Sequence, residues 1–145
     1  MWRFVKWIGG AIAIGGLLMQ FYRPARTNPP TDQTRTLGAR APVAPESAAV
    51  LKRACRDCHS HDTEWPWYSN VAPVSWFVID HVNHGRSHFN YSDWAKYDAE
   101  EGSRLLEKAC ELARNGEMPL PVYVPMHPDA RLSQADVDAI CRLHP

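Results

Sequence analysis

Cys55-Arg56-Asp57-Cys58-His59 is the stretch on which the interpretation of this chain depends. The C-x-x-C-H pattern is the attachment sequence of a c-type haem. Two cysteines three positions apart lie on one side of a helical turn, so each thiol can add to one vinyl group of the porphyrin. The histidine that follows can then supply the proximal ligand of the iron. The stretch therefore predicts one covalently held haem c per chain, with His59 on the metal and Cys55 and Cys58 as the attachment points.

Two other uses of a C-x-x-C pair are less consistent with the rest of the chain. A structural zinc site needs two further ligands, usually a second close pair. The remaining cysteines, Cys110 and Cys141, are too far apart in the sequence to form one. A thioredoxin-like dithiol follows a β-strand in a βαβ pattern, and no strand pattern precedes Cys55. Haem is therefore favoured over zinc and over a redox dithiol.

The N-terminal residues 1–23 read as a membrane anchor. Trp7 to Tyr22 contains no charged residue, and Phe4 and Val5 extend this apolar stretch if Lys6 reaches back to the interface. A cleaved signal peptide has a similar apolar region, but the bulky sequence Gln20-Phe21-Tyr22-Arg23 is a poor cleavage site. An uncleaved single-pass anchor is the favoured interpretation.

The charge on either side of the anchor does not settle its orientation. More Arg residues follow the apolar stretch than precede it, which by the positive-inside rule would keep the C-terminal part in the cytoplasm. Haem thioether bonds, however, are made on the outer side of the bacterial inner membrane. We give the chemistry more weight, and expect an inner-membrane protein with its haem domain in the periplasm.

Composition divides the remainder into a linker and a domain. Residues 24–45 hold five of the twelve prolines and hardly any large apolar residue, which is typical of an extended tether. Residues 46–145 form the expected haem-binding domain. Residues 55–145 carry eight Lys/Arg and fourteen Asp/Glu, a net charge of −6, so no nucleic-acid partner is expected. An acidic face could steer a basic redox protein, although scattered surface charge explains it equally well.

Apolar periodicity predicts an all-α domain. Helices are expected over Glu46–Cys58 and Pro73–His84, the second stopped by Gly85. A longer helix should end at Asn115-Gly116. Ser133 with Asp136 resembles a capping box and should open a last helix. No alternating β pattern of useful length is present.

The second axial ligand of the iron has two main candidates. Met118 lies in the proline-rich stretch Gly116-Glu117-Met118-Pro119-Leu120-Pro121, which can hold a thioether in a fixed place. A methionine that only fills a gap in the core is the alternative. His81 lies on the apolar stripe of its helix, where an imidazole needs a partner or a metal, and His84 shares roughly that face. The remaining histidines are expected next to the motif or on loops and the surface: His61, His88, His127 and His144.

Cys110 and Cys141 each fall on the inward stripe of a predicted helix. A disulfide between them would tie the long helix to the last one, in a compartment that permits disulfides. Two buried free thiols are the alternative, and the residues alone do not decide between them.

A string of further motifs resembles the bacterial haem-binding domain family that carries a single C-x-x-C-H. The resemblance covers residues 45–143 and rests on these stretches: Cys55-x-x-Cys58-His59-Ser60, Thr63-x-Trp65-Pro66-Trp67-Tyr68-Ser69, Ala72-Pro73-Val74-Ser75-Trp76, His81-Val82-x-x-Gly85-Arg86, Asn90-x-Ser92-x-Trp94, Gly116 to Pro121 with Tyr123, and His127-Pro128-x-Ala130-x-Leu132-Ser133. The resemblance implies a membrane-anchored envelope protein with one covalent haem, and it implies no particular reaction.

The combined interpretation is a small, all-helical, cytochrome c-like domain that carries single electrons, a role that requires no catalytic apparatus. Four aromatic residues would pack around the porphyrin and exclude water: Trp65, Trp67, Tyr68 and Trp76. A haem-based ligand sensor or a peroxidase-like module is the alternative. It would need an open iron site with an acid–base residue such as His81 beside it.

Overall fold

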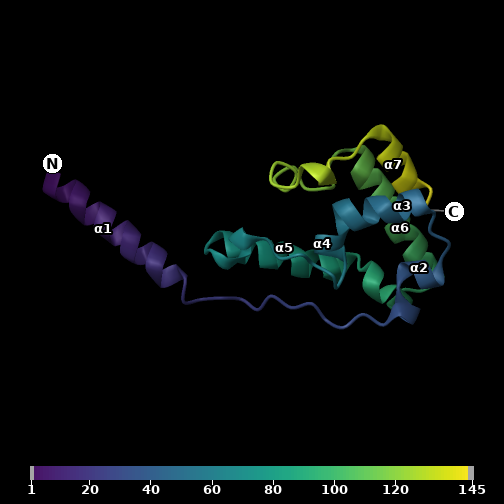
Figure 1. Cartoon of the computed structure of the whole chain (residues 1–145), viewed down its shortest axis with the longest axis horizontal. Coiled ribbons are helices and arrows are strands. Elements are labelled where there is room, and N and C mark those ends of the chain that lie inside the picture. The colour runs from purple at the N-terminus through teal and green to yellow at the C-terminus, as the bar shows by residue number, and fades with distance from the viewer. Residues whose placement is uncertain (1, 144–145) are drawn as a thin grey trace.

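The structure is a computed structural model, and it describes residues 2–143 (Figure 1). Met1 and residues 144–145, which include His144, lie outside the described residues. Every regular element between residues 2 and 143 is helical, so the expected all-α class is confirmed. The seven α-helices are α1 (Trp2–Met19), α2 (Leu37–Arg40), α3 (Pro45–Val50), α4 (Arg56–His59), α5 (Val74–His88), α6 (Ala99–Arg114) and α7 (Gln134–Cys141).

Helix α1 extends away from the helical body, and its described side chains contribute nothing to the core (Figure 1). It is long and apolar enough to cross a membrane, a property that signal sequences near an N-terminus share.

The cysteine motif lies at the end of one nearly continuous helical run. Helix α3 passes through a π-helical turn, Leu51–Cys55, directly into α4. The run belongs to two separate core clusters, because Val50 packs with Val137 and Ile140, while its neighbour Leu51 packs with Leu106 and Trp94. Packing on two sides therefore fixes the run that presents the motif. π-turns of this kind are frequently found at functional sites.

Helices α6 and α7 form the second part of the body, and α3 packs against α7. Helix α6 ends where the sequence predicts, since Gly116 takes the left-handed backbone conformation with φ 69°. The capping box of Ser133 and Asp136 is present at the start of α7. A disulfide joins Cys110 of α6 to Cys141 of α7, with their Cα atoms 4.6 Å apart.

The expectation that Gly85 stops a helix is wrong. Helix α5 continues through it to His88. Gly85 serves close packing instead, because a Cβ at this position would lie 2.5 Å from the carbonyl oxygen of Cys58. The lack of a side chain lets α4 and α5 approach each other, and that contact positions the motif.

The proline-rich segment 24–45 is extended over its first part, as expected, but it does not act as a free spacer. It runs along the body beneath α5 (Figure 1). Asn28 donates to the carbonyl of Thr63, Arg35 pairs with Asp93, and Leu37 is buried in the core with Leu51 and Trp94. These contacts hold the segment against the domain, so its length does not set the distance between α1 and the body.

Candidate haem site

His59 is held by the backbone of α5. Its Nδ1 donates to the carbonyl oxygens of Phe89 (2.9 Å) and Gly85 (3.1 Å). Burial lowers the pKa of His59, and the two carbonyls partly offset this effect. The ring is therefore neutral near pH 7, with the proton on Nδ1 and the lone pair of Nε2 free. This is the tautomer that a metal-binding histidine needs, and the carbonyl partners fix its orientation.

Two adjoining cavities lie beside the motif. The inner cavity, of about 510 Å³, is lined by residues from α4, α5, α6 and the following loop, among them His59, His84, Leu112 and Met118. The outer cavity, of about 240 Å³, has Trp67, Phe77, Val122 and Met126 in its lining. Both cavities share five lining residues: Asp57, Cys58, His81, Leu120 and Tyr123. They are neighbouring parts of one largely apolar hollow with the motif at its wall.

The two motif cysteines differ in their surroundings. Cys58 lines both cavities, whereas Cys55 packs against the core cluster around Trp94. Neither is in a disulfide. Burial raises the pKa of Cys55 to about 12 and that of Cys58 to about 11, the second with help from the Asp57 carboxylate. Both are therefore neutral thiols at pH 7. Cys55 lines neither cavity, so the structure does not place both thiols at the hollow as the motif predicts.

Both candidates for the second ligand line the inner cavity. Met118 lies on the loop after α6, and its backbone N–H donates to the carbonyl of Leu112 (3.2 Å). His81 lies on α5, and its Nδ1 donates to the carbonyl of Phe77 (2.8 Å), which leaves Nε2 free. His84 and His88 also line this cavity, with their Nε2 atoms 3.1 Å apart. The structure thus brings a thioether and several imidazoles to one hollow.

The four aromatic residues expected around the porphyrin are divided. Trp67 and Tyr68 line the outer cavity. Trp65 lines neither cavity. Trp76 also lies outside both, since its indole donates to the carbonyl of Tyr22 and its ring packs against that of Tyr22. Only two of the four expected aromatic residues, Trp67 and Tyr68, therefore line the hollow.

Tyr123, His127 and Arg86 contribute to the site, although the sequence assigned no role to any of them. Tyr123 donates to the carboxylate of Asp57 (2.7 Å) and stacks on His127 (3.8 Å between ring centroids), which ties the loop after α6 to the motif. Burial and the Asp57 carboxylate raise the pKa of Tyr123, so its hydroxyl keeps the donated proton. Arg86 donates to the carbonyl of Ser60 and to the hydroxyl of Thr63 (2.7 Å each). The only available signal was the position of these residues inside the family-like motifs.

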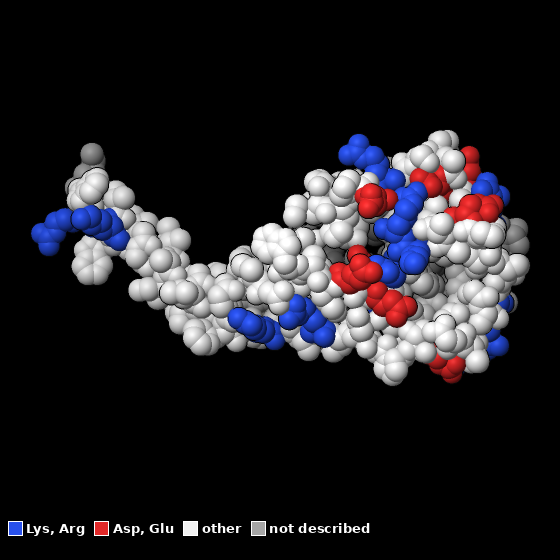
Figure 2. All heavy atoms as spheres, in the orientation of Figure 1, with Lys and Arg blue, Asp and Glu red and all other residues white. Residues whose placement is uncertain are grey.

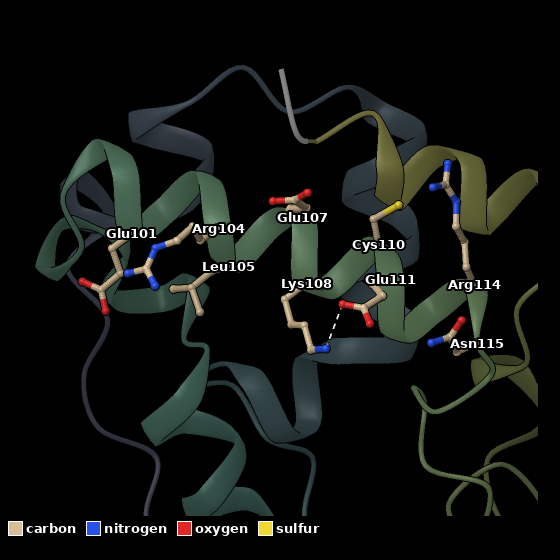
Figure 3. A pocket seen from close by; sticks show the side chains of 9 residues that line it. All are labelled: Glu101, Arg104, Leu105, Glu107, Lys108, Cys110, Glu111, Arg114 and Asn115. Carbon is tan, nitrogen blue, oxygen red and sulfur yellow. Dashed lines mark hydrogen bonds and ion pairs between the residues drawn. The ribbon is translucent and has the colours of Figure 1, made fainter.

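Another hollow, of about 700 Å³, lies along the outer face of α6 (Figure 3). Its lining alternates acidic and basic side chains, and Lys108 pairs with Glu111 at 2.8 Å. Open, mixed charge along one helix is typical of a solvated face and offers no converging donor set. No group of three or more His, Cys, Asp or Glu within residues 2–143 is arranged to hold a metal ion alone.

A family model described as a haem-binding domain matches residues 14–143. The chain belongs to this haem-binding domain family. No curated protein and no solved structure matched the chain. The donor set fits the cofactor, because a neutral, oriented imidazole and a thiol border a largely apolar hollow with a thioether and further imidazoles around it. The residues around the hollow beside the motif are thus of the kinds that could hold a haem.

Proposed function

We propose that this member of the haem-binding domain family is a membrane-anchored, c-type cytochrome-like protein that carries single electrons in the bacterial envelope. The observation that carries the proposal is His59, whose Nδ1 is held by two backbone carbonyls so that Nε2 is free for iron. Cys55 and Cys58 would attach the haem covalently, one per chain. A bound haem supplies an iron that alternates between the ferric and ferrous states.

The residues of the chain orient the cofactor and control its surroundings. The carbonyls of Gly85 and Phe89 hold the His59 imidazole in one orientation. The apolar lining of the hollow keeps water from the cofactor, which favours the ferrous state and raises the reduction potential. Met118 is the proposed second ligand, because a thioether has the same effect on potential and its loop is tied to the motif.

The proposed location is the bacterial inner membrane, with α1 as a single-pass anchor and the haem domain in the periplasm. Helix α1 has the length and composition for this role. The disulfide between Cys110 and Cys141 supports an oxidising compartment, since disulfides rarely persist in the cytosol. Haem thioether bonds are made in the same compartment.

The test is the absorption spectrum of the full chain, exported together with a haem-maturation system. The oxidised wild type should be low-spin, with a far-red sulfur–iron band that Met118→Ala removes. Met126→Ala is the matched control, because Met126 lines only the outer cavity and is exposed. If the band survives in Met118→Ala, Met118 is not the ligand. A low-spin spectrum lost in His81→Ala would assign His81 instead.

One observation favours a second candidate function. His81, His84 and His88 all line the inner cavity, so acid–base groups stand beside the proposed iron position. An open iron site there would suit a ligand sensor or a peroxidase-like module. Carbon monoxide binding to the reduced protein separates the two: rapid binding by the wild type supports the second candidate, and binding only after Met118→Ala supports electron transfer.

A further inference from the structure

The end of the body next to α1 carries exposed apolar side chains. They come from three segments: the residues that follow α1, the start of α5 with the turn before it, and the loop after α6. We call this set the apolar end, and its members are Phe21, Tyr22, Trp67, Val71, Val74, Phe77, Val122 and Met126, each at least 45 % exposed. An exposed apolar patch that is built from three separate segments is typical of a surface that binds an apolar partner or a membrane.

The charges of the chain avoid this end. Residues 65–79 contain no Asp, Glu, Lys or Arg, and neither do residues 118–126. The residues between α1 and Asp32 carry only Arg23 and Arg26. Figure 2 shows the part of the body nearest α1 as mostly uncharged, with the acidic side chains of this view gathered farther along the body. The residues that lead from α1 to the apolar end thus carry positive charge only, whereas Glu64, Asp80 and Glu117 flank its two uncharged stretches on the side of the body.

Direct bonds fix the position of the apolar end relative to α1. The side chain of Gln20 donates to the carbonyl of Ala72 (3.1 Å) and accepts from its backbone N–H (3.0 Å). The indole of Trp76 donates to the carbonyl of Tyr22 (2.9 Å). The start of α5 is therefore held beside the point where α1 ends (Figure 1).

We propose that the apolar end rests on the surface of the bilayer that α1 crosses, with its apolar side chains in the interfacial region and Arg23 and Arg26 against anionic headgroups. The inference rests on the proposed anchoring by α1. Aromatic side chains are favoured at the membrane interface, and basic side chains near the surface are attracted to anionic lipids. A polar recess of about 200 Å³ between Arg23, Arg26 and Ser69 lies in the same region.

A bound haem does not account for the whole surface. Some members line the outer cavity, where a haem could cover them: Trp67, Phe77, Val122 and Met126. The others line neither cavity: Phe21, Tyr22, Val71 and Val74. This second group stays exposed whatever fills the hollow. The outer cavity, lined in part by members of the apolar end, would consequently face the bilayer, and an electron partner would approach from the membrane side.

The experiment uses the full haem-loaded chain in nanodiscs that contain anionic lipid and a headgroup-chelated gadolinium lipid. The measurement is the intensity of backbone amide NMR signals, recorded with the iron ferrous and low-spin. Amides close to the labelled membrane surface lose intensity in discs with the gadolinium chelate, compared with discs that carry a lanthanum chelate. We expect intensity loss over residues 71–77 and 120–126, and none over α7. The double variant Val71→Asp/Val74→Asp should restore the signals of residues 120–126. Ala99→Asp/Ala135→Asp adds the same charge at exposed positions on α6 and α7 and should restore nothing.

The outcomes separate this inference from the proposed function. Signal loss at residues 18–22 but not at 71–77 and 120–126 would leave the anchor standing and overturn docking of the apolar end. Protein that leaves the membrane on carbonate washing would overturn both, while the absorption spectrum of the same sample reports on haem independently. A second copy of the chain could cover the apolar end instead. The signals of the apolar end would then shift only in discs that hold two copies, and gadolinium would cause no loss of intensity. That result would overturn bilayer docking.

Discussion

The two walls of the hollow proposed to hold the haem are built in different ways. The first wall is α4 against α5, two regular helices in backbone contact at Cys58 and Gly85. The second wall is residues 115–127, a chain of turns after α6 held to the first wall by the bond from Tyr123 to Asp57. One wall is defined by close packing of regular structure, and the other by a few side-chain contacts.

This difference explains why the sequence predicts one of the two proposed iron ligands more directly than the other. His59 is predicted by a short motif, and the backbone carbonyls of Gly85 and Phe89 orient its ring. The position of Met118 depends on how an irregular loop packs against α6 and the motif. The position of the proposed first ligand follows from local sequence, whereas that of the proposed second ligand depends on the assembled domain.

The largest loss of stability is expected when the disulfide that supports the second wall is removed. The disulfide between Cys110 and Cys141 closes a loop with a sequence separation of 31 residues. In the chain-entropy model its loss costs about 3–4 kcal/mol of unfolding free energy. Cys110→Ala/Cys141→Ala should show this loss in denaturant unfolding of the full chain, and chemical reduction of the wild type should reproduce it. A loss below about 1 kcal/mol would show that α6 and α7 hold together without the bond.

The next largest effect is expected from a substitution in the first wall, where α4 meets α5. Gly85→Ala places a methyl group 2.5 Å from the carbonyl oxygen of Cys58. Overpacking of this kind costs about 1–3 kcal/mol, more than the roughly 1 kcal/mol that alanine gains in a helix. We expect lower stability and less haem incorporated per chain, measured by unfolding and by the absorbance of haem against protein.

Gly38→Ala is the matched control for this substitution. Gly38 also lies in a helix, α2, but a Cβ there would meet nothing within 4 Å. It should leave stability and haem content unchanged or slightly raised. Equal behaviour of Gly85→Ala and Gly38→Ala would mean that the close contact in the first wall does not govern haem binding.

Sequence patterns predicted most of the regular elements of the fold, but they missed α2, which lies in the segment expected to be an extended linker. The capping box at Ser133 and the C-terminal glycine at Gly116 marked helix ends correctly, because the local backbone alone decides them. Gly85 was misread, since a glycine that ends a helix and one that admits a neighbouring helix look the same in sequence. Only the partner element distinguishes the two roles.

The second group of wrong predictions concerns the positions of isolated side chains. Leu37 and Val43 are the two large apolar residues of a polar, proline-rich stretch, too few to form a periodic pattern, so the burial of Leu37 and the docking of the segment had no signal in the sequence. Trp76 was expected at the porphyrin with the other aromatics, but it contacts Tyr22 beside the end of α1. Contacts between segments more than fifty positions apart leave no local pattern.

A smaller effect tests the link between the walls. Tyr123→Phe removes the bond to the Asp57 carboxylate and should cost about 1.5 kcal/mol of unfolding free energy, the usual range for a hydrogen bond to a charged group. Because the same loop carries Met118, the far-red sulfur–iron band should also weaken. Tyr22→Phe, which keeps its ring contact with Trp76, is the control and should change neither measurement. A band unchanged in Tyr123→Phe would show that the loop holds Met118 without this tie.

The smallest effect concerns a contact between the motif helix and α7. Arg53, in the π-turn before Cys55, pairs with Asp136 and also donates to the carbonyl of Asp129 (2.7 Å). The bond from Arg53, together with the bonds from Ser133, lowers the pKa of Asp136 from 3.8 to about 2. A carboxyl whose pKa is lowered by folding adds stability above its unfolded pKa, and that stability is lost as the pH falls through the folded pKa.

Asp136→Asn should therefore be less stable than the wild type at pH 7, and the difference should disappear as the pH falls from about 4 to about 2. The expected difference at pH 7 is about 1 kcal/mol, because the side chains of Arg53 and Asp136 are 33 % and 20 % exposed and solvent screens the pair. Denaturant unfolding across this range measures it, with Asp138→Asn on the exposed side of α7 as the control. A difference that persists at pH 2 would come from helix capping by Asp136 rather than from its charge, and the Arg53 contact would then add nothing to the attachment of the motif helix to α7.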